Sequence, residues 1–528
     1  DIIFYTLYGH NTVESVLKNK IGSSVKKGEI IAEIANYPEN GNWAPHLHFQ
    51  IMLSMLDYKI DFPGVCYFNQ IDVWKDLCPD PNLFFKSKDL GLDKSISLDE
   101  LIKHRKNHLG KSLKLHYEEP IHIVRGEGVY LMDSNGRKYL DTINNVAHVG
   151  HENESVVAKG KSQMAILNTN SRYLHKNINE LSKELLKTLP SKLSVVHFVN
   201  SGSEANELAI RMMKSHTRQS DIIVSEHGYH GNTNICVDIS SYKFDGKGGS
   251  GAPENTHVIP IPNNFRGKYR GTNSGKKYVM EVEKCIKKIK SKKRGLGGFI
   301  IEPILSCGGQ VELPKGFLKD TYKLIRKNGG ICISDEVQVG CGRLGEFFWG
   351  FEIHDVIPDI ITVGKPLGNG HPIGAVVCSK EIAESFANGM EFFNTFGGNP
   401  VSCSIATEVL RFINREKLQE KSKYIGDYFK GELKKLSKKF KIIGDIRGKG
   451  LFLGIEFVDS EMNPLKEDAV YIVNRLKKFG ILSSVDGPEN NVIKIKPPLT
   501  FNKHNCNMFI RYLNKILDED YLNKKHYE

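Results

Sequence analysis

Residues 331–338 read ICISDEVQ, a short apolar and β-branched run that leads into the carboxylate of Asp335. Residues 360–365 read IITVGK, a second run of the same kind that ends in the amine of Lys365. Such runs are typical of buried strands in a parallel sheet. In open α/β sheets, ligands bind just beyond the carboxyl ends of the strands. The sequence therefore predicts that Asp335 and Lys365 meet at one ligand.

This pair of side chains suits pyridoxal phosphate (PLP), which needs a lysine for its Schiff base and an acid beside its pyridinium nitrogen. The sequence also offers a phosphate site. Residues 195–199 (VVHFV) predict a strand, and residues 200–207 (NSGSEANE) then open a helix. The free N–H groups and the positive dipole end of such a helix could hold a phosphate. The alternative is an ordinary helix start with Ser203 as the N-cap.

Two further strand ends carry polar or aromatic residues. The loop HGYHG at 227–231 follows a strand at 222–224, and its Tyr229 either stacks on a flat ring or packs against its own domain. Residues 298–303 (GFIIEP) predict another strand that ends in a carboxylate, Glu302. Together with the strand ends at Asp335 and Lys365, this pattern favours a ligand site over ordinary βα loops.

From about residue 98 to about residue 520, the chain resembles the class III (ornithine and ω-amino acid type) PLP-dependent aminotransferases. The order and spacing of the shared motifs hold throughout. The motifs are NSGSEANE at 200–207, EP at 302–303, DEVQVG at 335–340, GKPLGNGHP at 364–372, NTFGGNP at 394–400 and RGKGL at 447–451.

The resemblance implies an α/β fold, type I of the PLP-dependent transferases, with a mostly parallel seven-stranded sheet in a large domain and a small α+β domain. A short all-β module is expected at the N-terminus. The expected divisions are 1–56 for this module, 57–97 for a linker, 98–149 for the first part of the small domain, 150–400 for the PLP-binding large domain and 401–528 for the rest of the small domain.

The resemblance also implies roles for individual residues. Lys365 would form the Schiff base and move the proton, and Asp335 would pair with the pyridine N–H. Gln338 would bind the ring hydroxyl, and Val337 and Tyr229 would contact the two ring faces. The other expected cofactor contacts are Ser201, Gly202 and Ser203 at the phosphate, and His230.

Further roles concern the substrate and a partner subunit. Thr395 would reach the phosphate of a neighbouring subunit, which implies a homodimer with shared active sites. Asn145, Glu302 and Arg447 would bind the substrate, with Arg447 facing its anionic group. A bidentate guanidinium suits a carboxylate or a phosphate. The expected partner is a small-molecule amine.

The substrate is suggested by a departure from the family pattern. Many relatives have a glutamate where this sequence has Cys307. The motifs GKPLGNGHP at 364–372 and NNVAH at 144–148 are most similar to those of the alanine–glyoxylate aminotransferase 2-like branch, which includes phospho-lyases. We therefore expect transfer of an amino group from a small primary amine or amino acid to a keto acid. The alternative is elimination of phosphate and ammonia from a phosphorylated amino alcohol such as phosphoethanolamine.

Residues 1–56 suggest a function of another class. Tyr-Gly-His at 8–10 and His-Leu-His at 46–48 resemble the C-terminal half of lysostaphin-type (LytM) zinc endopeptidases, in which His48 would be a zinc ligand and His10 and His46 catalytic. A zinc peptidase or a cell-wall-binding module would follow. That family takes two more ligands from an upstream motif, and one protein ligand does not hold zinc. We therefore favour a β module without metal.

Composition sets wider limits. A chain of 528 residues is too long for one core, so about two to four domains are expected. The net charge is +12, but the densest lysines, at 276–294, accompany apolar residues with helical spacing, which predicts an amphipathic helix and not a nucleic-acid site.

The ten cysteines include no Cys-x-x-Cys pair, as expected of a cytoplasmic protein. No signal peptide or membrane-spanning run is visible, and a chain that begins at Asp1 is expected to be part of a longer polypeptide.

Overall fold

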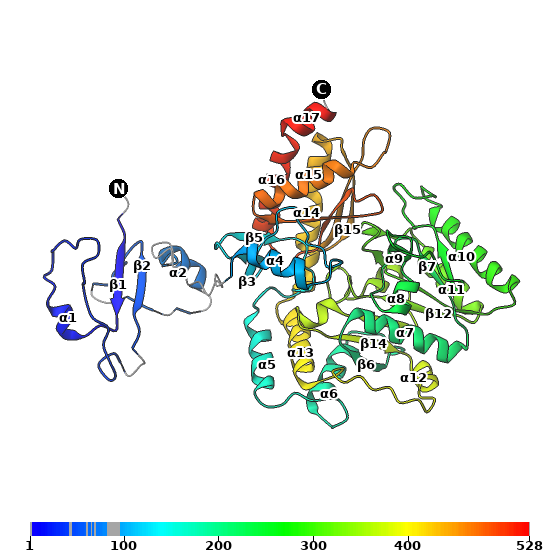
Figure 1. Cartoon of the computed structure of the whole chain (residues 1–528), viewed down its shortest axis with the longest axis horizontal. Helices are drawn as coiled ribbons and strands as arrows, with labels where there is room; N and C mark the ends of the chain where they lie inside the picture. Colours follow the sequence, from blue (N-terminus) through cyan, green and yellow to red (C-terminus); the bar gives the residue numbers. More distant parts are fainter. Residues whose placement is uncertain are drawn as a thin grey trace. The chain divides into compact units, whose positions relative to one another are not determined.

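The computed structural model describes residues 3–41, 45–59, 62–64, 66–67, 70–81 and 96–526. The chain divides into two units, Asp1–Leu92 and Asp93–Glu528 (Figure 1). In its described residues, the first unit has two antiparallel strands, β1 (Tyr5–Gly9) and β2 (His48–Met52), with Gly9 opposite His48. It also has two short helices, α1 (Val13–Leu17) and α2 (Ile71–Leu77).

The expectation that this N-terminal module is all-β is wrong. The Thr12 side chain accepts a hydrogen bond from the backbone N–H of Ser15 at 3.3 Å, which caps α1. Residues 25–32 contain a turn at Gly28, whose positive φ of 88° interrupts an extended backbone. Helix α2 lies within the segment that was expected to be a linker.

The second unit is built on a seven-stranded sheet in the order β6-β14-β13-β12-β9-β7-β8. Strand β14 runs antiparallel to its neighbours β13 and β6, and all other neighbouring pairs are parallel. This confirms the expected mostly parallel seven-stranded sheet. The strands are β6 (Val195–Val199), β7 (Asp221–Ser225), β8 (Thr256–Ile259), β9 (Leu296–Ile301), β12 (Ile331–Asp335), β13 (Ile360–Val363) and β14 (Gly374–Cys378).

The sheet is buried on both faces because successive side chains of a strand point to opposite sides. In β12, Ile331 and Ile333 join the core formed with helix α7 (Gly202–Thr217). Cys332 joins the core formed with α10 (Ser274–Ser291) and α11 (Phe317–Lys327). Helix α10 is the amphipathic helix predicted at 276–294, and its Val282, Ile286 and Ile289 are buried.

Two smaller four-stranded sheets, in the orders β17-β5-β4-β3 and β15-β16-β19-β18, complete the unit together with the hairpin β10-β11. Strand β17 pairs in parallel with β5, far earlier in the sequence, as expected if residues 98–149 and the tail share one domain. The strands are β3 (Ile123–Glu127), β4 (Tyr130–Asp133), β5 (Lys138–Asp141), β10 (Ile304–Leu305), β11 (Val311–Glu312), β15 (Ile443–Lys449), β16 (Phe452–Phe457), β17 (Ile481–Leu482), β18 (Ser484–Asp486) and β19 (Val492–Ile495).

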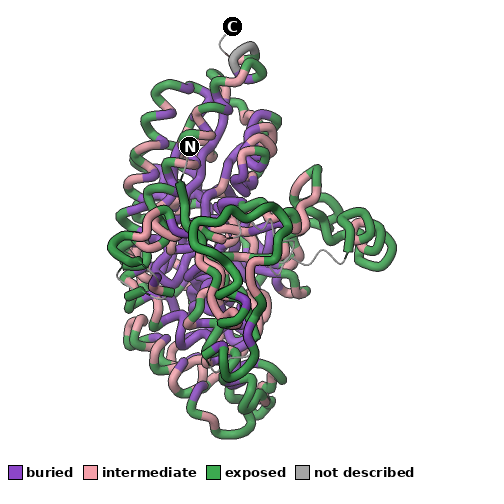
Figure 2. The backbone as a smooth tube through the Cα atoms, turned by 90° about the vertical axis from the view of Figure 1, so that its left-hand side faces the viewer, coloured by how far each residue is buried: buried purple, intermediate pink, exposed green. Residues whose placement is uncertain are grey.

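The remaining helices surround these sheets, and Figure 2 shows buried backbone in the interior and exposed backbone at the margins. Ser97 and Glu100 form a reciprocal capping box at the start of α4. No helix in the described ranges is both long and apolar enough to cross a membrane. The helices are α4 (Leu98–His108), α5 (Glu154–Met164), α6 (Lys176–Leu186), α8 (Asn234–Asp238), α9 (Ser241–Phe244), α12 (Lys380–Phe386), α13 (Pro400–Arg415), α14 (Leu418–Lys439), α15 (Lys466–Lys478), α16 (Lys503–Leu517) and α17 (Asp520–His526), with 3₁₀ turns η2 (Gly350–His354) and η3 (Lys365–Gly368).

Candidate active site

A cavity of about 320 Å³ lies at the carboxyl ends of β6, β7, β12 and β13. Its wall brings together most of the residues that the sequence singled out for the cofactor. Those residues are Ser201, Gly202, Ser203, Tyr229, His230, Asp335, Val337, Gln338 and Lys365. Four others, Asn145, Glu302, Thr395 and Arg447, do not line it.

Asp335 is the last residue of β12 and is buried, with 2% of its surface exposed. Its Oδ2 accepts a hydrogen bond from Asn206 Nδ2 at 2.8 Å and lies 2.8 Å from His230 Nδ1. Its Oδ1 accepts the backbone N–H of Val337 at 3.1 Å. Asn206 is itself held by Thr362, whose Oγ1 donates to Asn206 Oδ1 at 2.7 Å. The carboxylate is therefore fixed in one orientation at the cavity wall.

Lys365 reaches the same cavity from the neighbouring strand. Strands β12 and β13 are parallel, with Asp335 opposite Thr362. Lys365 lies three positions beyond Thr362, after Gly364, and begins the turn η3. Parallel neighbours end at the same sheet edge, so the amine and the carboxylate emerge side by side, as the sequence predicted.

The first turn of α7 provides an anion cradle. Ser201 is the N-cap, accepting the backbone N–H of Glu204 at 3.1 Å, so the alternative in which Ser203 caps the helix is wrong. The backbone N–H groups that follow have no partner within a helix, and a helix start favours anions. A Cβ at Gly202 would come within 2.7 Å of Val337 Cγ1, so this close approach requires glycine.

Two polar or aromatic side chains complete the wall. The Gln338 Oε1 accepts a hydrogen bond from Asn145 Nδ2 at 2.6 Å, so Asn145 acts on the cavity through Gln338. The ring of Tyr229 packs edge-on against Tyr242 with centroids 5.7 Å apart. Burial raises the pKa of Tyr229. An amine, a carboxylate, an anion cradle and a flat ring together fit PLP.

Glu302 and Arg447 already have partners elsewhere in the fold. Glu302 is buried, its Oε1 accepts from Ser306, and its Oε2 has no hydrogen-bond partner within the described residues. Burial, together with the charge of Asp335, raises the pKa of Glu302 to about 7. Arg447 donates from Nε to the Gly309 carbonyl at 2.7 Å, and its Nη1 pairs with two carboxylates, Asp445 and Glu456. Its charge is therefore already balanced.

Thr395 is exposed and lies outside the cavity wall of its own chain. Its predicted contact with a neighbouring subunit stays a prediction.

Asn206 is the functional residue that sequence reasoning missed. It lies four positions after Gly202 on α7, and residues four apart share a face of a helix. That spacing places Asn206 on the same side as the anion cradle. Val146, His371, Pro372 and Ile373 also line the cavity and were not singled out.

In the N-terminal unit, the His10 ring lies 4.4 Å from that of His46 and 6.0 Å from that of His48, centroid to centroid. His10 Nδ1 lies 2.8 Å from the Asn40 carbonyl oxygen. The described part of the chain contains no group of three or more histidine, cysteine, aspartate or glutamate side chains that could hold a metal ion. The zinc role suggested for His48 has no such group to support it.

The sheet, the Asp335–Lys365 pair and the α7 cradle define a PLP-dependent enzyme of the type I fold. The profile of the family described as Aminotransferase class-III matches residues 114–517. The chain belongs to this family of PLP-dependent enzymes.

Two curated relatives and one solved structure show where this chain lies within the family. It is 46% identical to the Alanine–glyoxylate aminotransferase 2-like protein of Drosophila melanogaster, over 79% of this chain and 86% of the relative. It is 39% identical to Ethanolamine-phosphate phospho-lyase homolog 1 of Caenorhabditis elegans, over 80% and 94%. A phospholyase from Arthrobacter in complex with phosphoethanolamine superposes with a TM-score of 0.76 and 34% identity, over 79% of this chain and 99% of that one.

Proposed function

We propose that this class III aminotransferase acts on a small primary amine that carries a phosphate, and that it passes the amino group to a keto acid. The observation that carries the proposal is the meeting of Lys365, Asp335 and the α7 cradle in one cavity. The phosphate on the substrate is suggested by the phosphoethanolamine bound to the Arthrobacter phospholyase.

Each cavity residue then has a task. Bound PLP supplies an electron-withdrawing ring that stabilises negative charge on the carbon next to the amine. Lys365 removes the proton from that carbon and returns it one position away. Asp335, held by Asn206 and His230, would pair with the ring nitrogen. The expected contacts with the ring and its substituents are Gly202, Ser203, Tyr229, His230, Val337 and Gln338, with Ser201 capping the cradle.

Phosphate elimination is the second candidate, and it begins with the same proton removal by Lys365. If the C–O bond to the phosphate on the next carbon then breaks, inorganic phosphate leaves. Water completes the reaction, so phosphoethanolamine and water give acetaldehyde, ammonia and phosphate. Two relatives named phospho-lyases, in Caenorhabditis elegans and Arthrobacter, favour this candidate, since this chain covers 94% and 99% of their lengths.

One assay separates the two outcomes. PLP-loaded protein is given phosphoethanolamine with and without glyoxylate, and glycine, phosphate and ammonia are measured. Transfer forms glycine only when glyoxylate is present, with no release of phosphate. Phosphate and ammonia in equal amounts without glyoxylate would instead establish elimination. Lys365→Ala is the control and is expected to lower either rate at least about 100-fold, because proton transfer is lost. Absence of both products in the unaltered protein would contradict the proposal.

We also propose a homodimer in which Thr395 reaches the partner's cofactor. Ile166, Leu174 and Phe396 are exposed apolar side chains on two neighbouring segments. The segments are joined by Arg172, whose Nη2 lies 3.1 Å from Glu391 Oε1. Exposed apolar groups gathered in this way mark interaction surfaces.

The domain boundaries at 98–149, 150–400 and 401–528 are proposed as well, supported by the β5–β17 pairing. The lysostaphin-like origin of residues 1–56 and a cytoplasmic location stay predictions from the sequence.

A further inference from the structure

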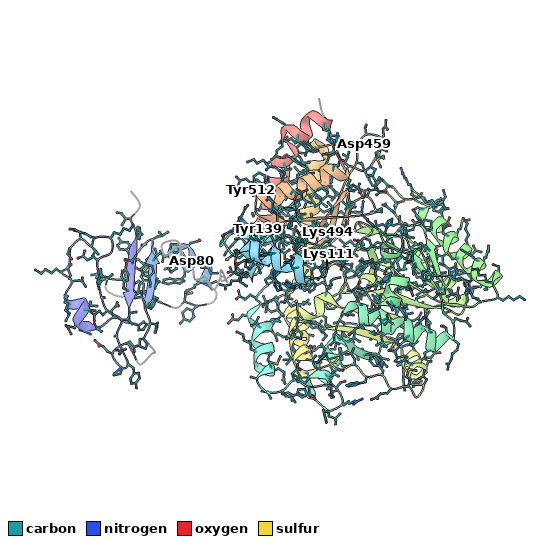
Figure 3. All side chains as sticks on the ribbon, in the orientation of Figure 1. Asp80, Lys111, Tyr139, Asp459, Lys494 and Tyr512 are labelled. Atoms are coloured by element: carbon teal, nitrogen blue, oxygen red, sulfur yellow. The ribbon has the colours of Figure 1, made fainter. Side chains whose placement is uncertain are left out.

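Two lysines in the β19 segment have no part in the roles assigned so far. Lys494 is on β19 and is labelled in Figure 3, and Lys496 follows the end of that strand. Residues two apart on an extended chain point the same way. Both reach Asp486 at the end of β18: Lys494 Nζ lies 3.1 Å from its Oδ1, and Lys496 Nζ lies 3.5 Å from its Oδ2.

Lys496 is a buried ammonium group with spare donors. Only 4% of its surface is exposed, and its backbone N–H donates to the Thr142 carbonyl at 2.6 Å. Among the described residues, its Nζ forms the 3.5 Å ion pair with Asp486 and lies 5.3 Å from the centroid of the Phe452 ring, but it makes no hydrogen bond. An ammonium carries three donors, and a buried charge is costly unless it is paired and hydrogen-bonded. Lys496 is therefore suited to receive an anion.

Neither lysine belongs to the cavity wall, and the pair is connected to that wall through neighbouring segments. Gly487, directly after β18, donates its backbone N–H to the Cys307 carbonyl at 3.1 Å, and Gln310 Nε2 donates to Asp486 Oδ2 at 2.9 Å. These contacts tie the pair to the segment that follows Glu302. Burial lowers the pKa of Lys496 to about 8 against the opposing charge of Asp486, and Lys365 is close enough to contribute to that lowering.

The charges at this position favour a phosphate. Two lysines and Asp486 leave one net positive charge. Arg447, the guanidinium expected to meet the substrate, is already paired with Asp445 and Glu456. A guanidinium fork suits a carboxylate or a phosphate, and an ammonium binds phosphate as a point charge. The segment therefore offers ammonium donors for the anionic end of a substrate.

We propose that Lys496, assisted by Lys494, binds the phosphate group of the substrate and so selects phosphorylated amines. This inference rests on the proposed function and names the residues that determine its specificity. Asp486 holds both lysines in place and acts as a positioning residue.

The test replaces Lys496 by a neutral side chain of similar length, Lys496→Met, in the PLP-loaded protein. Bound PLP then occupies the α7 cradle, so added phosphate reports on another site. The dissociation constants of phosphoethanolamine and of inorganic phosphate are expected to rise roughly 10- to 100-fold, as for loss of hydrogen bonds to a charged group. The dissociation constant of ethanolamine is expected to stay within about twofold of its value in the unaltered protein. Lys434→Met, at an exposed position on α14, is the matched control and should change none of them.

The outcomes separate this inference from the proposed function. If phosphoethanolamine is not turned over at all, the lysine pair is still tested by measuring how phosphate inhibits the turnover of another amine that the enzyme accepts. Equal weakening of ethanolamine and phosphoethanolamine would show a structural role and overturn the inference. Unchanged phosphate inhibition in Lys496→Met would also overturn it. A larger loss for β-alanine than for phosphoethanolamine would identify a carboxylate site instead.

Discussion

Glu302 is a carboxyl group buried at the end of β9, with one oxygen bonded to Ser306 and the other without a partner in the described residues. Burial first, and the charge of Asp335 second, raise its pKa to about 7. An unfolded glutamate loses its proton near pH 4.3. Between these values the folded protein holds a proton that the unfolded chain has lost, so this group's contribution to stability falls as the pH rises.

Replacing Glu302 by glutamine removes this dependence. In coenzyme-free protein, the melting temperature of Glu302→Gln minus that of the unaltered protein is expected to increase as the pH rises from 5 to 8. The reason is that only the unaltered protein must bury an ionising carboxyl at position 302. Thermal unfolding at four or five pH values measures the difference. If the melting temperatures of the two proteins changed in parallel with pH, the raised pKa of Glu302 would be contradicted.

Sequence reasoning worked for residues whose role follows from their place at a strand end. Asp335 and Lys365 each end an apolar run, so their meeting could be predicted. The supports of Asp335 could not, because Asn206 and His230 lie 129 and 105 positions away and only the folded sheet brings them together. The pairing of Arg447 with Glu456 was missed for a similar reason, since it depends on β15 and β16 being neighbours.

At the scale of elements, the start of α7 combines packing with anion binding. Gly202→Ala places a methyl group 2.7 Å from Val337 Cγ1 and is expected to destabilise the fold by about 1–3 kcal/mol through overpacking. It should also weaken PLP binding, because the first helical turn is displaced. Chemical unfolding and a PLP titration measure the two effects.

Gly431→Ala provides the matched control. Gly431 lies on α14, and a Cβ there would meet no atom within 4 Å. This change is expected to stabilise the helix by up to about 1 kcal/mol and to leave PLP affinity unchanged. If both glycine variants behaved alike, the close approach of α7 to Val337 would have no role in cofactor binding.

Elements with strong apolar runs were predictable, and the short helix α1 was not. Strands β6, β12 and β13 matched their predicted residues because each is a short, mostly apolar run bounded by turn residues. Helix α1 was missed because its five residues carry little periodicity and depend on the Thr12 cap. A short helix of this kind has no pattern that a sequence alone could reveal.

At the scale of the whole molecule, the apolar surface around Ile166 and Leu174 makes a testable case for the homodimer. The double change Ile166→Asp and Leu174→Asp should convert a dimer into monomers, because it puts charges into an apolar contact. Sedimentation measures the mass, and PLP affinity should fall as the partner's contact is lost. Met280→Asp, at an exposed apolar position on α10, is the control. A monomeric unaltered protein would contradict the dimer.

The β5–β17 pairing also affects how the chain is synthesised. Thr142 follows β5 and donates to the Leu482 carbonyl at 2.6 Å, across 340 positions of sequence. At about 5–20 residues per second, on the order of 20 to 70 seconds separate the two segments as they leave the ribosome. During that interval the backbone N–H and C=O groups on one side of β5 are not yet paired with β17, and an open strand edge readily pairs with other nascent chains. Chaperone capacity during translation, and not the stability of the finished enzyme, is therefore expected to limit the yield of soluble protein.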